Sequence, residues 1–312
     1  MGRAAVWTVA GAALLAAAML TVLGVGDAAG ALPNWQAFVL GIVQGATELL
    51  PVSSSGHLIL VPWLGDWEYL KEHETFNQTF DVALHLGTLV AVVGYFWRDL
   101  LVLVGAWLRT LRTRRLETPE ERIAWFVVVA TIPAAVIGLL GEDVIAEHLG
   151  EPWQIAILLF VFAGLLWLAD RRPQEKGMAS LGFKAAFGVG LAQSLALMPG
   201  VSRSGVTITA GRFLHLDRDA AARFSFLLLV PTVLGAVILK GVTDVVLGEL
   251  PPGSGGPFLV GTLAAAGSGL IAIDALLGYV RRHDYSIFVW YRIVVATIVL
   301  LLIVSGARSA GF

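Results

Sequence analysis

Two short polar segments, each set in apolar sequence, carry the side chains of this chain that are best suited to chemistry. The first holds the carboxylate of Glu48, the hydroxyl of Ser54 and the imidazole of His57, and the second holds the guanidinium of Arg203. Ser54 and His57 stand within one helical turn, as a hydroxyl nucleophile and a proton acceptor would. Glu48 suits a base or an oxygen ligand for a hard cation, and the fork of Arg203 suits a phosphate. These residue types indicate chemistry on a phosphate group.

The two segments match each other at a constant offset of 149 positions. Five residues of the first recur in the second: Gly41, Gln44, Ser53, Ser55 and Gly56 correspond to Gly190, Gln193, Ser202, Ser204 and Gly205. This pattern indicates an internal duplication. One copy carries the acid and the imidazole, and the other carries the cation.

The composition places both segments in a membrane protein, because 57% of the residues are apolar, 14% are charged and the mean hydropathy is +0.80. Seven stretches approach the roughly 20 residues that a helix needs to cross a bilayer: 5–25, 82–97, 123–141, 152–169, 224–239, 257–273 and 293–306. The absence of cysteine excludes disulfides, thiolate metal sites and cysteine nucleophiles. We expect the lipid bilayer, and no nucleic acid, as the surroundings of this chain.

Loop charges predict how the chain is threaded, because Lys and Arg near span ends stay in the cytoplasm. The basic segments 98–122, 171–184 and 281–292 should lie inside, and the acidic or Gly/Pro-rich segments 66–74, 142–151 and 244–256 should lie outside. Each polar segment then enters and leaves by one face. We therefore predict two re-entrant hairpins, at 32–62 and 183–213, that dip in from opposite sides.

These elements predict an all-α integral membrane protein built as an inverted repeat, each half one re-entrant hairpin plus three transmembrane helices. The predicted divisions are an extra N-terminal transmembrane helix (1–30), a first repeat (31–170) and a second repeat (171–312). Inverted repeats with broken helices build ion and anion sites near the bilayer midplane. A cleaved signal peptide is the alternative for the leading span, because the sequence at 28–31 consists of small residues.

The hairpin tips have the features of an anion site. Pro51 and Pro199 should end the entering half-helices, and the serines that follow are natural N-caps for the exiting halves. A helix N-terminus attracts phosphate oxygens through its free N–H groups. A purely structural interpretation is also open, in which Glu48 pairs with Arg203 and the serines only cap.

Two further pairs of polar residues lie inside predicted spans. Asp81 and His85 share a helix face, and they either line a substrate cavity or hydrogen-bond between helices. Asp274 and Arg292 lie near the inner ends of neighbouring spans, and for them we predict a structural ion pair.

Both polar segments resemble motifs of the undecaprenyl-diphosphate phosphatase (bacitracin-resistance) family. The stretch from Gln44 to His57 is similar to its Glu/Gln-x-x-x-Glu and Pro-Val-Ser-Ser-x-Gly-His signature, and Pro199 to Thr207 to its Pro-Gly-x-Ser-Arg-Ser-x-x-Thr motif. The segment from Phe80 to Thr88 is similar to a third family segment. The resemblance covers roughly residues 35–306 and leaves the leading span outside.

The resemblance implies a hydrolase that needs Mg²⁺ or Ca²⁺ and converts undecaprenyl diphosphate to undecaprenyl phosphate, the lipid carrier of peptidoglycan synthesis. It assigns Gln44 and Glu48 to the metal or base site, and Glu48, Ser54, His57 and Arg203 to catalysis. It places Arg203 and Thr207 in the phosphate site. From their position at the hairpin tips, we expect Ser53, Ser55, Ser202 and Ser204 to bind phosphate as well. Gln44 replaces a carboxylate that many members have, which removes one charge. The sequence leaves open whether Ser54, His57 or a water molecule attacks.

Rival functions are a lipid transporter, which inverted repeats commonly build, and the other lipid-phosphatase superfamily. A transporter has no need of Ser54, His57 and Arg203 together. The second rival fails on spacing, because Thr209 stands where its histidine should follow Ser202 and Arg203. We expect a multi-pass protein of the bacterial plasma membrane whose site opens toward the outer face. A homodimer is compatible with the sequence, which does not fix the oligomeric state.

Overall fold

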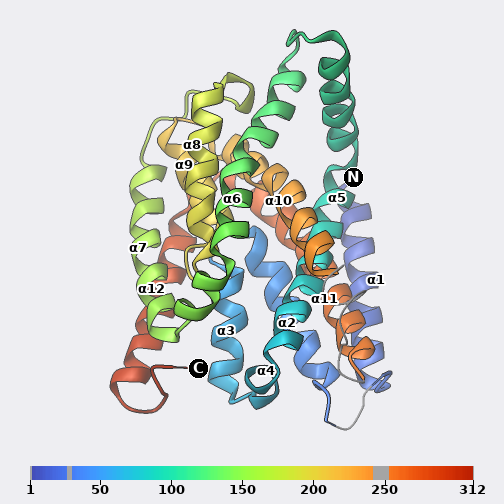
Figure 1. Cartoon of the computed structure of the whole chain (residues 1–312), viewed down its shortest axis with the longest axis vertical. Coiled ribbons are helices and arrows are strands. Elements are labelled where there is room, and N and C mark those ends of the chain that lie inside the picture. The colour runs from blue at the N-terminus through green and yellow to red at the C-terminus, as the bar shows by residue number, and fades with distance from the viewer. Residues whose placement is uncertain (1, 27–29, 242–252, 312) are drawn as a thin grey trace.

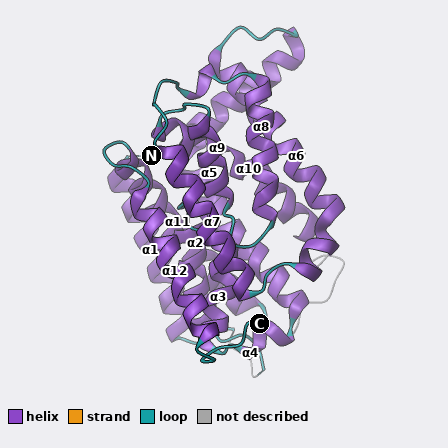
Figure 2. Ribbon diagram, turned by 90° about the vertical axis from the view of Figure 1, so that its left-hand side faces the viewer, coloured by secondary structure: helices purple, strands orange, loops and turns teal. Residues whose placement is uncertain are grey.

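The computed structural model describes residues 2–26, 30–241 and 253–311, and these residues form helices and loops without a strand (Figure 2). Within these described ranges, seven helices are long and apolar enough to cross a membrane, and each overlaps one predicted span. They are α1 (Arg3–Val22), α5 (Glu74–Thr113), α6 (Pro119–His148), α7 (Pro152–Asp170), α10 (Arg218–Lys240), α11 (Gly255–Val280) and α12 (Ser286–Val304). The chain is an all-α, multi-pass membrane protein, as predicted.

Each predicted re-entrant segment folds into a helical hairpin. The first consists of α2 (Asn34–Leu49) and α3 (Ser54–Gly65), and the second of α8 (Phe183–Ser194), the 3₁₀ turn η2 (Leu195–Leu197) and α9 (Arg203–Phe213). The arms are 11 to 16 residues long, which is short of the roughly 20 residues that a span requires. Figure 1 shows α2 and α3 in the lower half of the molecule and α8 and α9 in the upper half. The division of the chain into two inverted repeats stays a prediction.

The short connecting helices lie outside the hairpins. α4 (Glu68–Glu72) follows the first hairpin, and η1 (Met178–Ser180) precedes the second. Residues 28 and 29 of the small-residue sequence, and residues 244–252 of the third segment expected outside, lie beyond the described residues.

Glycines bring each hairpin into backbone contact with one long helix. A methyl group at Gly41 would lie 2.4 Å from the Gly261 carbonyl oxygen of α11, and one at Gly45 would lie 2.0 Å from Ser268 Oγ. In the other hairpin, a methyl group at Gly190 would lie 2.5 Å from the Ala130 carbonyl oxygen of α6. Small residues permit this approach between helices in membranes. We call these two contacts, α2 against α11 and α8 against α6, the glycine seams.

The seam at Gly45 should be sensitive to a single methyl group. We expect Gly45→Ala to destabilise the protein by about 1–3 kcal/mol, because the added carbon overpacks a contact that backbone atoms also form. Gly188→Ala is the matched control, since nothing lies within 4 Å of its added methyl group. Thermal unfolding of both variants in one detergent measures the difference. A melting temperature of Gly45→Ala at or above that of Gly188→Ala would contradict the backbone contact.

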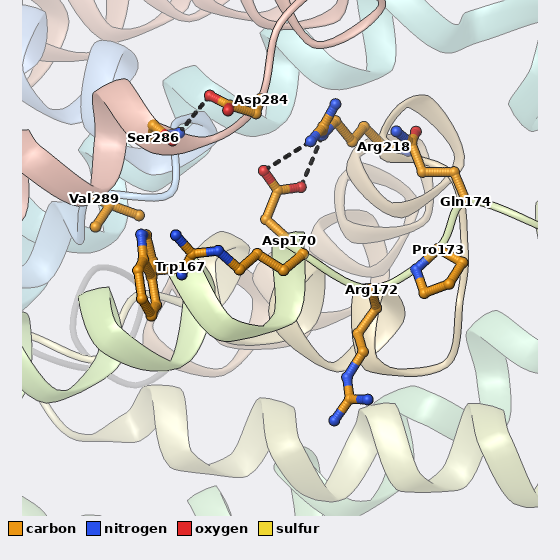
Figure 3. Close-up of a pocket in the computed structure, with 10 residues that line it drawn as sticks. Trp167, Asp170, Arg172, Pro173, Gln174, Arg218, Asp284, Ser286 and Val289 are labelled. Carbon is orange, nitrogen blue, oxygen red and sulfur yellow. Dashed lines mark hydrogen bonds and ion pairs between the residues drawn. The ribbon is translucent and has the colours of Figure 1, made fainter.

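Ion pairs and a hydrogen bond of Asp170 tie α7, α10 and the start of α12 together. Figure 3 shows the pair that Asp170 forms with Arg218. The Asp170 carboxylate accepts from Arg218 Nε at 2.8 Å, from Arg212 Nε at 3.3 Å and from the Tyr285 backbone N–H at 2.9 Å. A cavity of about 420 Å³ opens beside it and is lined by none of the predicted site residues. The network brings the basic segments 171–184 and 281–292 to one end of the bundle, as the loop charges predicted.

The leading helix α1 packs along α11. Arg3 Nε lies 3.1 Å from Asp274 Oδ2, and Trp7 Nε1 donates to the same oxygen at 3.2 Å. The predicted ion pair between Asp274 and Arg292 is therefore wrong, because the carboxylate is bound by α1. The guanidinium of Arg292 has other partners, described below.

Candidate active site

The tips of the two hairpins meet inside the molecule through polar contacts. Ser53 caps α3 and Ser202 caps α9, and the two hydroxyls accept from the N–H groups of Gly56 and Gly205. Ser53 Oγ also accepts from the Gly200 N–H of the other tip at 3.1 Å. In return, Ser204 Oγ donates to the Leu50 carbonyl oxygen of the first tip at 2.8 Å.

Both capping serines have a backbone conformation that favours glycine. The φ angle is 77° at Ser53 and 75° at Ser202. Such strain costs about 1–3 kcal/mol per residue and persists only where the surroundings enforce it, often at functional sites. The same strain at two equivalent positions marks the tips as a candidate site.

Glu48 lies at the centre of this junction with only 5% of its surface exposed. Its Oε1 accepts from Arg203 Nη2 at 3.0 Å and from Arg203 Nε at 3.3 Å. Its Oε2 accepts a short hydrogen bond from the Ser54 hydroxyl. The structure therefore joins the acid of the first hairpin to the cation of the second, and the Ser54 hydroxyl is aimed at that acid.

Arg203 is held in place from a third element. Its Nη1 donates to the Ser225 carbonyl oxygen of α10 at 2.8 Å. Thr207 Oγ1, one turn along α9, donates to Ser225 Oγ at 2.8 Å. Helix α10 thus fixes the direction of the guanidinium, which leaves it pointing at Glu48.

Ser54 and His57, the predicted catalytic pair, have different partners in the structure. His57 Nδ1 lies 2.6 Å from the Ser53 carbonyl oxygen, and its Nε2 lies 2.8 Å from the Tyr291 hydroxyl of α12. Because the carbonyl can only accept, Nδ1 carries a proton. The hydroxyl of Ser54 is bonded to Glu48 instead. The roles assigned to both residues stay predictions.

The residues predicted to bind phosphate lie around the tips in different settings. Ser53 and Ser202 are buried caps. Ser204 is buried and bonded to the first tip, and Thr207 is buried and bonded to Ser225 of α10. Ser55 is only partly buried, in the first turn of α3. All of these side chains share one junction with Arg203.

Three neighbours of the site lie outside the two hairpin motifs, on long spans. His85 Nε2 of α5 is 3.5 Å from Glu48 Oε2, while its Nδ1 donates to the Asp81 carbonyl oxygen at 2.7 Å. Tyr291 meets His57, and Arg292 reaches carbonyls of both tips. The sequence did indicate His85, because it lies in the segment from Phe80 to Thr88 that resembles a third family segment. For Tyr291 and Arg292 of α12, the sequence showed only that a charged residue, Arg292, lies inside a predicted span.

The residues around Glu48 fit a divalent cation that is held jointly with a phosphate. Gln44 Oε1 is buried and has no hydrogen-bond partner among the described residues, while Gln44 Nε2 donates to Glu48 Oε2 at 3.3 Å. Across the described residues no group of three or more His, Asp or Glu side chains is arranged to hold a metal alone. Mg²⁺ is commonly bound by one or two protein oxygens together with substrate phosphates. Glu48 and the free oxygen of Gln44 match that donor set.

Comparison with known proteins identifies the family of this chain. The model of the family described as bacitracin resistance protein BacA matches residues 37–298. An undecaprenyl-diphosphatase from Pelotomaculum thermopropionicum is 44% identical over 279 residues, covering 89% of this chain and 99% of the relative. One from Thermomicrobium roseum is 47% identical over 283 residues, covering 88% and 99%. With a family match across most of its length and relatives this similar, the chain belongs to the bacitracin resistance protein BacA family.

Proposed function

We infer that this chain is a membrane-embedded undecaprenyl-diphosphatase. It hydrolyses undecaprenyl diphosphate to undecaprenyl phosphate and inorganic phosphate, which recycles the lipid carrier of peptidoglycan synthesis and gives bacitracin resistance. The single observation that carries this inference is the Ser54 hydroxyl bonded to Glu48, whose other oxygen is bound by Arg203. The names of the relatives support the identity of the substrate.

The junction suits a diphosphate for electrostatic reasons. The N-termini of α3 and α9 meet there, and each brings free N–H groups and a partial positive charge. Arg203, whose side chain is only 10% exposed, adds a full charge in a region of low dielectric. Donors fixed in such a site stabilise the charge that develops in the transition state.

We propose that the incoming diphosphate competes with Glu48 for Arg203. Phosphate oxygens match the guanidinium fork, so binding frees the carboxylate to accept the proton of Ser54. Ser54 Oγ then forms a bond to the terminal phosphorus, the bond from that phosphorus to the bridging oxygen breaks, and undecaprenyl phosphate leaves. Glu48 gives that proton to the departing undecaprenyl phosphate. A water molecule next attacks the phosphoserine and passes one proton to Glu48, the bond from phosphorus to Ser54 Oγ breaks and phosphate leaves, and Glu48 returns its proton to Ser54 Oγ. One water is consumed.

We further propose that Gln44 and Glu48 hold Mg²⁺ or Ca²⁺ against the diphosphate. When bound, this ion would neutralise charge on the phosphate oxygens. His57, bonded to Tyr291 and to the Ser53 carbonyl, holds the start of α3 and so orients Ser54. Both ring nitrogens of His57 are thereby engaged, which favours Ser54 over His57 as the attacking group.

We propose that the end of the bundle with the basic segments faces the cytoplasm. The first hairpin then enters from the outer face and presents Glu48 and Ser54 there. This orientation is supported by the rule that Lys and Arg residues near the ends of spans stay on the cytoplasmic side. A site between spans can open sideways into the lipid, so the isoprenoid tail needs no tunnel.

Phosphate release tests the proposed function directly. We expect the purified protein to release inorganic phosphate from undecaprenyl diphosphate, and we expect EDTA to abolish release until Mg²⁺ or Ca²⁺ is restored. The readout is phosphate per mole of protein over time. Movement of intact undecaprenyl diphosphate across vesicles without phosphate release would instead identify a transporter.

The attacking group can be identified by trapping. With substrate labelled at the terminal phosphorus and an acid quench at early times, we expect label on Ser54 of the wild-type protein, because covalent catalysis leaves such an intermediate. Ser54→Ala should carry none, whereas the neighbouring Ser55→Ala should label normally. Release of labelled phosphate by Ser54→Ala at the wild-type rate would exclude Ser54 as the nucleophile and leave water.

A further inference from the structure

Arg292 of α12 is a fully buried guanidinium at the junction of the two hairpins, although it belongs to neither. Buried charges in membrane proteins are costly and mark functional sites. Arginine keeps its charge in proteins, so Arg292 remains a cation in this position. Its location calls for an explanation beyond packing.

The hydrogen bonds of Arg292 join three separate parts of the chain. Its Nη1 donates to the Pro51 carbonyl oxygen of the first tip at 3.2 Å. Its Nη2 donates to the carbonyl oxygens of Gly200 and Val201 in the second tip, at 3.0 and 3.1 Å. Its Nε donates to the Leu159 carbonyl oxygen of α7 at 3.2 Å. One planar side chain thus links both tips to the surrounding bundle.

The tip carbonyls that Arg292 binds stand just before the two strained serines. Pro51 lies two residues before Ser53, and Val201 directly precedes Ser202. In a trans peptide the C=O and the following N–H point in opposite directions. Binding the Val201 carbonyl therefore also fixes the direction of the Ser202 N–H. Charge-assisted hydrogen bonds of this kind are roughly twice as strong as neutral ones, which suits them to hold strained backbone.

The two serines in turn begin the helices that carry the chemistry. Ser53 precedes Ser54 at the start of α3, and Ser202 precedes Arg203 at the start of α9. A shift of one tip against the other would separate Ser54 and Glu48 from Arg203. Misplacement by about 1 Å can cost about 10²-fold in rate.

We propose that Arg292 is a positioning residue that holds the tips of both hairpins in register, so that Glu48 and Ser54 face Arg203. Its contribution is the span of the planar fork and not its charge alone, because a lysine ammonium is a compact charge that cannot reproduce that fork. The effect of Arg292 on turnover rests on the proposed function. Its effect on the relative position of the two hairpins can be measured whether or not that function is right.

The test compares Arg292→Lys and Arg292→Met with Arg212→Lys. Arg212 is the matched control, because it is also fully buried and also donates to backbone carbonyls, but it lies beside Asp170 at the far end of α9. Because the chain contains no cysteine, cysteines introduced at Leu64 of α3 and Leu191 of α8 would be the only sites that a spin label modifies. Both side chains are exposed. Measurements are kcat, KM and the distribution of distances between the two labels.

We expect both Arg292 variants to lose about 10²-fold in kcat with a smaller change in KM, and to show a broadened or shifted label distance. Arg212→Lys should lower thermal stability but keep the wild-type distance and kcat. Near-normal kcat in Arg292→Lys, or lost activity with an unchanged distance distribution, would overturn the proposal. If the wild-type protein released no phosphate, the proposed function would fail while the distances still tested the positioning.

A second variant covers the case in which the Arg292 variants do not fold. A methyl group at Gly205 would lie 2.8 Å from Arg292 Nη1, so Gly205→Ala displaces the guanidinium without removing it. The equivalent Gly56→Ala places its methyl group against Ile155 and Ser53 instead. We expect Gly205→Ala to change the label distance and to lose more kcat than Gly56→Ala. Equal effects of the two substitutions would contradict the role of Arg292.

Discussion

Glu48→Gln should lower kcat about 10³-fold or more while leaving a folded protein. The amide keeps the size of the side chain but cannot take a proton from Ser54, and a positioned proton acceptor contributes about 10²–10⁴-fold. The substitution also replaces the charged partner of Arg203 and one of the two oxygens assigned to the divalent cation. The rate of phosphate release at saturating substrate, with excess Mg²⁺, measures the effect.

Glu121→Gln is the control for loss of a buried carboxylate. Glu121 is 3% exposed and accepts from the backbone N–H of Thr118 at 3.0 Å, near the start of α6. We expect this variant to lose stability and retain turnover. A rate for Glu48→Gln within tenfold of the wild type would rule out Glu48 as the proton acceptor.

Arg203→Ala should lower kcat/KM about 10³-fold, close to the upper range for removal of one donor that stabilises a developing anion. Arg203→Lys restores a charge without the fork and should recover only part of that loss. The loss should appear in both KM and kcat, because the guanidinium is proposed to bind the diphosphate before and during the reaction. Initial rates over a range of substrate concentrations separate the two.

The double variant Glu48→Gln/Arg203→Ala tests whether the two residues act as one unit. Residues in direct contact give strongly non-additive effects, so the double variant should be little worse than the worse single variant. Full additivity would indicate that the observed ion pair has no part in turnover. Thermal unfolding of all three proteins controls for loss of fold.

Much of the fold could be predicted because the decisive signals are local. Apolar length defined the spans, and Pro51 with the serines after it defined a break that the structure places between Leu49 and Ser54. Positions of helix ends were less accurate. α5 extends to Thr113, well beyond the predicted span, because the Leu and Arg residues that follow the span are strong helix formers.

The site was predictable where its residues lie in the two motifs. Glu48 and Arg203 meet as expected, because the two motifs lie at hairpin tips that contact each other. His85 and Tyr291 could not be placed, since a contact between distant spans depends on helix rotation and packing that one sequence does not reveal. Arg292 was paired with the wrong partner for a related reason. A sequence displays carboxylates, but it does not show which backbone carbonyls lose their helical partners at a broken helix.

The glycine seams limit how the site can open to admit a lipid. Since α2 touches α11 through backbone atoms, and α8 touches α6 in the same way, neither hairpin can slide past its neighbour without a steric clash. An opening that keeps these seams moves α2 with α11, or α8 with α6, and breaks the contacts between the tips that the caps, Arg203 and Arg292 now form. On the proposed mechanism, the gate for the diphosphate headgroup would be the contact of Glu48 with Arg203, so that entry of substrate and exposure of Ser54 would be one motion.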